Sequence, residues 1–306
     1  MTETGTALTV EAFAKVNRSL RVLGKRPGGY HEIDTVFQTV DLTDTLFFLE
    51  GEEGDGDVSL TVEGADLPAD GSNLILRAAH ALRERFSVNR GARIHLSKRI
   101  PVGGGMGGGS SNAASALRGL VALWELPATE ADLHPVAASL GSDVPFFLLG
   151  GCARGRGRGE VLTPLPDGPE EWLVLAFPPF GLSTAAVYGA SSTASLTDSG
   201  AETNLRSSGF GGGPDRNDLE PAAESLRGEL RRLRLALSEH GATSARLSGS
   251  GSTVFGAFGD GGSARRAFEG LAGLRKEMTV AMTIVTTVSR AAFARRAMPS
   301  MKAQHG

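Results

Sequence analysis

The chain has 306 residues, of which 41% are hydrophobic and 21% are charged, and its formal net charge is −3. This length predicts two domains, or one large one, with enough residues to bury a core. The absence of a basic excess argues against an extended nucleic-acid surface, and no stretch approaches the roughly 20 apolar residues of a membrane span. We therefore expect a globular protein without nucleic-acid or membrane partners.

Cysteine use and the first residues indicate the compartment. Cys152 is the only cysteine, so no disulfide can form within the chain, which fits a reducing environment. Residues 1–10 have neither the basic region nor the apolar run of a signal peptide. The expectation is a cytoplasmic protein, with monomer and homodimer both left open.

The first half of the chain predicts strands, one helix and a glycine-rich segment. Residues 7–14 partly alternate and are rich in β-forming residues, which predicts a strand. Further strands are expected at 45–50 and 57–63, and helical spacing after an asparagine predicts a helix at 73–86. A last strand at 92–100 leads directly into the glycine-rich segment.

The second half, which begins near Cys152, again mixes strands and helices. In chain order we expect a buried strand at 171–178, a flexible surface loop at 191–215, a long helix at 217–240, a strand–turn–strand unit at 242–258, a helix at 264–274 and a strand at 278–288. Antiparallel signals among these elements favour an α+β fold over a repeated βαβ winding.

The glycine-rich segment reads "PVGGGMGGGSSNAA" from residue 101 and runs into a predicted helix. Glycine accepts positive φ and close approach of other groups, while a helix N-terminus carries free N–H groups. Together they form an anion site suited to phosphate. Ser110, Ser111 and Asn112 stand where helix caps are expected, and the two serine hydroxyls could also reach a phosphate or Mg²⁺.

Several interpretations of this segment compete. A Walker A loop is excluded because no lysine follows the glycines. Gly103, Gly105 and Gly108 fit the dinucleotide pattern G-x-G-x-x-G, but the acidic strand end that should follow is missing. A different triphosphate-binding loop remains, and a flexible surface turn is the minor option beside so regular a helix.

This segment resembles the phosphate loop of the GHMP small-molecule kinases. Residues 12–46 resemble the opening of the 4-diphosphocytidyl-2-C-methyl-D-erythritol kinase family within that group. The blocks at 140–160, 216–220 and 246–258 follow in the order and spacing of that family. The resemblance implies a two-domain α+β fold, with a ribosomal-protein-S5-like domain over 1–158 and a ferredoxin-like domain over 159–306.

The resemblance also implies a catalytic pair. Asp143 lies in "GSDVPFF", before an apolar run where an unpaired acid would be costly. By composition alone it could be a helix cap or a solvated loop acid, but the resemblance makes it the catalytic base. Lys15 ends the predicted strand and would by itself be a solvent-exposed lysine. The resemblance makes it the partner of Asp143. Asn17 lies two residues further on, on the same strand face, and is a candidate for binding substrate hydroxyls.

Substrate recognition rests on the same resemblance. It places Tyr30 on the cytosine face, His31 on its edge, Tyr188 as a second stacking ring and Thr184 beside the substrate. Core packing is an equal alternative for Tyr188, which stands where relatives carry phenylalanine. The turn within 248–255 would close over the site from the second domain, or be an ordinary hairpin turn.

The resulting hypothesis is an ATP-dependent, Mg²⁺-assisted kinase that phosphorylates a hydroxyl of a cytidine-diphosphate-linked methylerythritol. No acidic Mg²⁺ ligand is evident from spacing, although other kinases of this superfamily use a glutamate, so the metal ligands stay open, with Ser110 or Ser111 as possible ones. The nucleotide-binding candidates are Pro101, Val102, Gly103, Gly104, Gly105, Met106, Gly107, Gly108, Gly109, Ser110 and Ser111. The rivals are another enzyme of the superfamily, such as a mevalonate- or homoserine-type kinase or a diphosphate decarboxylase, a non-catalytic nucleotide-binding protein, and a dinucleotide oxidoreductase.

Overall fold

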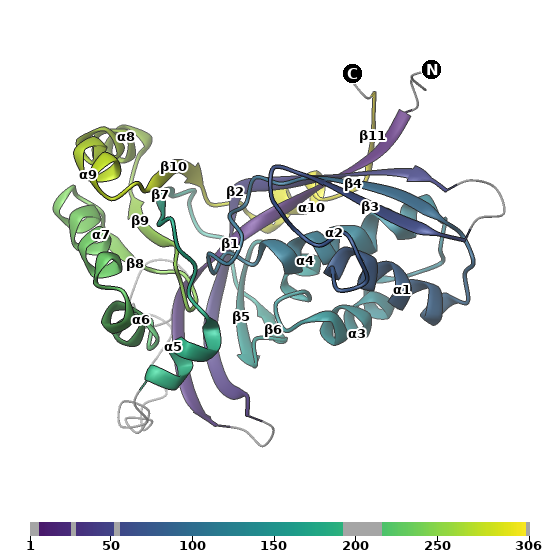
Figure 1. Ribbon diagram of the computed structural model, residues 1–306, viewed down its shortest axis with the longest axis horizontal. Helices are drawn as coiled ribbons and strands as arrows, with labels where there is room; N and C mark the ends of the chain where they lie inside the picture. Colours follow the sequence, from purple (N-terminus) through teal and green to yellow (C-terminus); the bar gives the residue numbers. More distant parts are fainter. Residues whose placement is uncertain (1–5, 26–28, 52–55, 192–215, 304–306) are drawn as a thin grey trace.

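A computed structural model describes residues 6–25, 29–51, 56–191 and 216–303. Figure 1 shows helices and strands gathered in two groups, with two long strands, β1 and β2, reaching from one group to the other. The first and last described strands lie side by side, because β11 runs along β1. Mixed helices and two separate sheets confirm the predicted two-domain α+β fold.

The larger sheet is built on β1 (Thr6–Lys25) and β2 (His31–Glu50), which pair antiparallel along their length. Its other strands are β3 (Val58–Glu63), β4 (Ala92–Ser97), β5 (Cys152–Gly157), β6 (Val161–Pro164) and β11 (Ser300–Ala303). The order is β11-β1-β2-β4-β3, and β5 pairs with the other end of β2 and with β6.

Helices cover both faces of this sheet. Below it in Figure 1 lie α1 (Leu74–Phe86), α2 (Gly108–Leu123), α3 (Glu130–Leu140) and α4 (Phe146–Leu149). Alternate β1 residues such as Val10 and Ala12 pack toward these helices, whereas Phe13 packs against Phe293 of α10 (Arg290–Arg296). Asn73 caps α1 as predicted, because its Oδ1 accepts a hydrogen bond from the Ile75 N–H at 3.0 Å.

The smaller sheet has the order β10-β7-β9-β8. Its strands are β7 (Trp172–Phe177), β8 (Ser244–Leu247), β9 (Val254–Phe258) and β10 (Ala281–Thr286). The helices of this half are α5 (Thr184–Ala190), α6 (Glu220–Leu226), α7 (Gly228–Glu239), α8 (Gly261–Gly270) and α9 (Ala272–Glu277).

Successive side chains of β7 point to opposite faces of the smaller sheet and so pack into two different apolar clusters. Val174 and Ala176 face the cluster formed with the helices of the second half, while Leu173 and Leu175 face a cluster with Ala14 of β1. Ile100 and Met106, which flank the start of the glycine segment, belong to that second cluster. A shared apolar core therefore fixes the glycine segment against both domains.

Four predicted elements differ from the structure. The strand expected at 45–50 is the end of β2, which begins at His31. The first strand continues past residue 14 to Lys25, because the polar residues that end the apolar pattern still pair with β2. The helix expected at 217–240 is two helices, separated where Arg227 adopts φ −145°. The helix expected at 264–274 divides at Leu271. The apolar spacing continues across both breaks, so periodicity did not reveal them.

The remaining expectations are mostly met. Strands at 57–63, 92–100, 171–178 and 278–288 and the strand–turn–strand unit are present, with ends shifted by a few residues. The loop expected at 191–215 lies outside the described residues except for Ser191. The domain division at residue 158 stays a prediction, with β6 and β11 both pairing in the larger sheet. Within the described ranges, no helix has the length and apolarity to cross a membrane.

We predict that Gly119→Ala destabilises the larger domain. A Cβ at this position in α2 would lie 2.4 Å from the Phe48 ring, inside the core. We expect the free energy of unfolding, measured by urea denaturation, to fall by about 1–3 kcal/mol. The matched control is Gly273→Ala in α9, where a Cβ meets nothing within 4 Å. An unchanged stability of Gly119→Ala would contradict this packing.

Candidate active site

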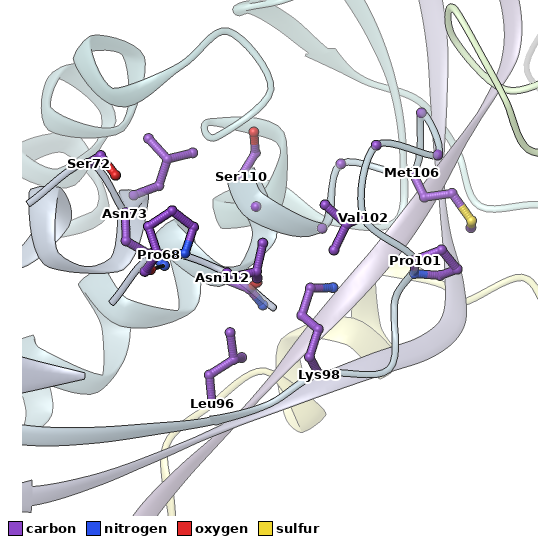
Figure 2. Close-up of a pocket in the computed structure, with 18 residues that line it drawn as sticks. Pro68, Ser72, Asn73, Leu96, Lys98, Pro101, Val102, Met106, Ser110 and Asn112 are labelled. Atoms are coloured by element: carbon purple, nitrogen blue, oxygen red, sulfur yellow. Dashed lines mark hydrogen bonds between the residues drawn. The ribbon is translucent and has the colours of Figure 1, made fainter. Parts of the chain in front are cut away.

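Two cavities meet at the glycine segment. The first, about 390 Å³, lies between residues 101–109 and the residues that precede α1, including Pro68, Ser72 and Asn73 (Figure 2). The second, about 1020 Å³, is a cleft lined by residues of both halves. Gly105, Gly107 and Ser110 line both cavities. A phosphoryl group bound there would face both spaces.

The helix that follows the glycines begins earlier than predicted. Gly107 is the residue before α2, with φ 71° and no side-chain cap, so the predicted capping by Ser110, Ser111 or Asn112 is wrong. Ser110 lies in the first turn and lines both cavities, whereas the buried Ser111 lines neither. The first-turn N–H groups of α2 therefore remain available to an anion.

Close contacts explain the glycines at two positions. Gly105 has φ 75°, and a Cβ there would lie 2.3 Å from the Ser248 carbonyl oxygen. Gly107 has φ 71°, and its Cβ would lie 2.7 Å from the Phe147 ring. The loop is held from both domains, because Lys15 N–H donates to Met106 O at 3.1 Å and Thr253 N–H donates to Gly104 O at 3.1 Å. A side chain at position 105 would collide with the Ser248 carbonyl, and one at position 107 would collide with the Phe147 ring.

The structure brings Lys15 and Asp143 together. The Lys15 Nζ lies 3.5 Å from Asp143 Oδ2, and their side chains are 5% and 29% exposed. Nζ also donates to Asn17 Oδ1 at 2.7 Å and to Gly105 O at 2.9 Å. Burial lowers the pKa of the Lys15 ammonium, and Asp143 opposes that shift. Lys15 stands inside β1 rather than at its end, which corrects the sequence-based placement.

Asn17 is held by a chain of hydrogen bonds that sequence reasoning missed. Its Nδ2 donates to Thr35 Oγ1 at 2.8 Å, and Thr35 in turn donates to Ser19 O at 2.6 Å. These hydrogen bonds fix the Asn17 amide so that its oxygen faces Lys15. Thr35 gave no signal in the sequence, because the strand that carries it was predicted only from residue 45 on.

The structure shows how the aromatic residues of the cleft lie, while their predicted roles toward a base stay predictions. His31 and Tyr188 stack on each other, with ring centroids 4.4 Å apart and an interplanar angle of 19°. Tyr30 is 58% exposed, and the Arg158 guanidinium lies 5.1 Å from its ring centroid. All four residues line the cleft.

Two of these groups have shifted pKa values. Burial, and then the nearby charge of Lys25, lower the pKa of His31, which favours the neutral imidazole. Burial raises the pKa of the Tyr188 hydroxyl to about 12, with a contribution from Asp143. Both rings are therefore mainly uncharged near neutral pH.

The turn between β8 and β9 reaches the site as expected. Gly249 and Ser250 line the cleft, and the Ser250 and Thr184 hydroxyl oxygens are 2.9 Å apart. Ser248 donates its hydroxyl hydrogen to Gly105 O at 3.0 Å. The second domain thus contacts the same carbonyl that Lys15 binds.

A second buried ion pair, also missed from the sequence, lies beneath the smaller cavity. Lys98 Nζ is 2.9 Å from Asp44 Oδ2, and Asp44 is fully buried. Figure 2 shows Lys98 rising toward the glycine segment beside Asn112. The position of Lys98 at the end of a strand, just ahead of the glycines, was the available signal.

Comparison with known proteins agrees with this geometry. Residues 73–151 match the family model of the GHMP kinases N terminal domain, and residues 201–274 match that of the GHMP kinases C terminal domain. A 4-diphosphocytidyl-2-C-methyl-D-erythritol kinase of Pelotomaculum thermopropionicum is 45% identical over 85% of this chain and 92% of its own. The enzyme of that name from Moorella thermoacetica is 41% identical over 91% of this chain and 98% of its own.

Solved structures give the same assignment. A crystal structure of 4-(cytidine 5'-diphospho)-2C-methyl-D-erythritol kinase matches with a TM-score of 0.74 and 37% identity, covering 90% of this chain and 98% of the other. A homoserine kinase from Cytophaga hutchinsonii matches with a TM-score of 0.68 over 96% of this chain and 97% of its own. Its sequence is only 17% identical, so this match shows a shared fold and nothing more. The chain belongs to the GHMP kinases, within the 4-diphosphocytidyl-2-C-methyl-D-erythritol kinase family.

Proposed function

We propose that this chain transfers the γ-phosphoryl group of ATP to a hydroxyl of 4-diphosphocytidyl-2-C-methyl-D-erythritol, giving the 2-phosphate and ADP in non-mevalonate isoprenoid precursor biosynthesis. The observation that carries this proposal is the Lys15–Asp143 pair, which lies in the cleft where it adjoins the glycine segment. We place the reaction in the cytoplasm, because a chain that relies on no internal disulfide fits a reducing compartment.

Asp143 is the proposed base. The acceptor hydroxyl gives its proton to the Asp143 carboxylate while its oxygen forms a bond to the γ-phosphorus. The bond from that phosphorus to the bridging oxygen breaks, and ADP leaves with the electron pair. Asp143 suits this role because its side chain is partly open to the cleft while one oxygen faces Lys15.

Lys15 has two roles in this proposal. Its ammonium group lies 3.5 Å from Asp143 Oδ2 and orients the carboxylate that accepts the proton. Its other contacts, to Asn17 and to Gly105 O, fix the ammonium between the base and the glycine segment. The same cation therefore lies close to the charge that develops on the transferring phosphoryl group.

The nucleotide and its metal ion are proposed to occupy the smaller cavity. The N–H groups among residues 102–110 would bind the triphosphate at the start of α2. Among the described residues no cluster of three His, Cys, Asp or Glu could hold a metal ion. Mg²⁺ bound mainly by phosphates needs few protein oxygens, and the Ser110 hydroxyl, which lines both cavities, fits as one of them. The ion would offset phosphate charge.

The cleft is proposed to bind the cytidine-linked alcohol. Tyr188 offers a ring face and His31 a polar edge for the base, and Tyr30 lies at the entrance. Asn17 and Thr184 offer an amide and a hydroxyl near the acceptor side of the cleft. Because His31 and Tyr188 stack on each other, a base that stacks on the enclosed face of Tyr188 must first separate them.

A substrate panel tests the reaction. With ATP and Mg²⁺, we expect ADP release, measured in a coupled assay, with the cytidine-linked methylerythritol and at most background release with mevalonate or homoserine. The hydroxyl phosphorylated is identified by phosphorus NMR of the product. Comparable release with mevalonate or homoserine would overturn the substrate assignment and leave a kinase of another kind.

The variant Asp143→Asn tests the base. Removing a general base costs about 10²–10⁴-fold in kcat, and we expect a loss of this size with an unchanged ATP dissociation constant. The exposed Asp66 provides the control variant Asp66→Asn, for which kcat should equal that of the unmodified protein. Full turnover by Asp143→Asn would refute the assignment.

The pH dependence tests Lys15. A lysine is charged below its pKa, and burial lowers that of Lys15 below the ordinary value of 10.5. Activity should therefore be present at neutral pH and decline as pH rises through the lowered value. Lys15→Arg should retain part of the activity and shift this decline to higher pH, because arginine stays charged.

The control for this profile is Tyr188→Phe. Burial raises the pKa of the Tyr188 hydroxyl to about 12, so its removal should leave the alkaline decline unchanged. An alkaline decline that is identical in Lys15→Arg and in the unmodified protein would show that another group causes it.

A further inference from the structure

Asp44 is a buried carboxylate to which the proposed reaction assigns no role. It lies in β2, is 0% exposed, and its oxygens accept four contacts. Oδ1 accepts the N–H groups of Arg99 at 2.7 Å and Ile100 at 2.8 Å. Oδ2 accepts the Asn112 amide at 2.8 Å and lies 2.9 Å from Lys98 Nζ. A buried carboxylate is costly unless hydrogen bonds and an opposite charge compensate for its lost hydration, and these four contacts do so for Asp44.

These contacts hold both ends of the glycine segment. Arg99 and Ile100 immediately precede residue 101, and Asn112 lies in α2 just after the glycines. One carboxylate therefore joins β2, the entry of the loop and the helix that follows it. The loop between these two fixed points is the wall of the nucleotide cavity.

Lys98 contributes a cation to that wall. An ammonium group has three hydrogens, and two are used by Ile100 O and Asp44. Figure 2 shows the amine pointing up toward the glycine segment from the floor of the cavity. Its Nζ lies 3.1 Å from the position that a Cβ on Gly108, the first residue of α2, would occupy. The third hydrogen is thus next to the anion site at the helix start.

We propose that Asp44 is a positioning residue that keeps Lys98 charged and directed at the triphosphate of the bound nucleotide. This inference rests on the proposed nucleotide site and adds a cation and its support to it. Phosphate fits better than the base, because the amine lies beside the helix N-terminus, where both charges favour an anion.

The electrostatics of the cavity support this role. Burial lowers the pKa of Lys98, while Asp44 raises it. Among the described residues that line this cavity, no other side chain carries a titratable group, and Lys15, on the other side of the loop, faces Asp143. Without the Asp44 carboxylate, the Lys98 pKa falls further, and the cation is lost as pH rises.

The test is calorimetric titration of the full chain with ATP and, separately, with adenosine. Loss of a charge-assisted hydrogen bond corresponds to about 10- to 100-fold in affinity. We expect that loss for ATP in Lys98→Met and in Asp44→Asn, with adenosine affinity changed less than about 3-fold. In Asp44→Asn, ATP affinity should fall further between pH 7 and 9, unlike in the unmodified protein.

Two controls separate positioning from general damage. Asp34→Asn removes a partly buried carboxylate of the same strand, which pairs with Arg154, and should leave ATP affinity unchanged. If Asp44 acts through Lys98, adding Asp44→Asn to Lys98→Met should weaken ATP binding no further. A fully additive loss in the double variant would overturn the proposal.

Other outcomes are equally decisive. Asp44→Asn that binds ATP like the unmodified protein, or variants that lose adenosine and ATP equally, would overturn the inference and leave the proposed kinase intact. Absence of ATP binding by the unmodified protein would overturn both. If Asp44→Asn does not fold, Lys98→Met decides, because Asp44 then keeps the Arg99, Ile100 and Asn112 donors.

Discussion

A buried ammonium needs acceptors, and the three acceptors of Lys15 define the site. Lys15 lies within β1, Asp143 in the turn between α3 and α4, and Gly105 in the glycine segment. Segments far apart in the sequence must converge on this one cation, because leaving any of its hydrogens unpaired in the interior is costly. The convergence places a base, a cation and a phosphate loop together.

The rest of the fold keeps this convergence rigid. The glycine segment is bound to β1 through Met106 O and to the second domain through Ser248 and Thr253. Beneath it, the apolar core shared by β1, β7 and Met106 prevents the two halves from separating at this point. Asp44 fixes the two ends of the loop from β2. Polar contacts thus set the position of each group, and apolar packing supplies the stability.

Sequence alone predicted what depends on local patterns. Alternation and helical spacing located most strands and helices, and the glycine run with its following helix predicted an anion site. The resemblance supplied the Lys15–Asp143 pairing, which no local pattern contains. The support from Thr35 and Asp44 depends on register between distant strands, and the stacking of His31 on Tyr188 depends on how helix α5 docks beside β2. Periodicity encodes neither. The break at Arg227 was missed because the apolar spacing of the helix continues across it.

The central claim is that one cation and one carboxylate prepare the acceptor hydroxyl beside the nucleotide. A crystal structure with a non-hydrolysable ATP analogue and the cytidine-linked alcohol tests it most directly. The account predicts the acceptor hydroxyl at about 2.6–3.2 Å from an Asp143 carboxylate oxygen, with the γ-phosphate on the Gly105 side of Lys15. A hydroxyl turned away from Asp143, or a γ-phosphate outside the glycine segment, would contradict it.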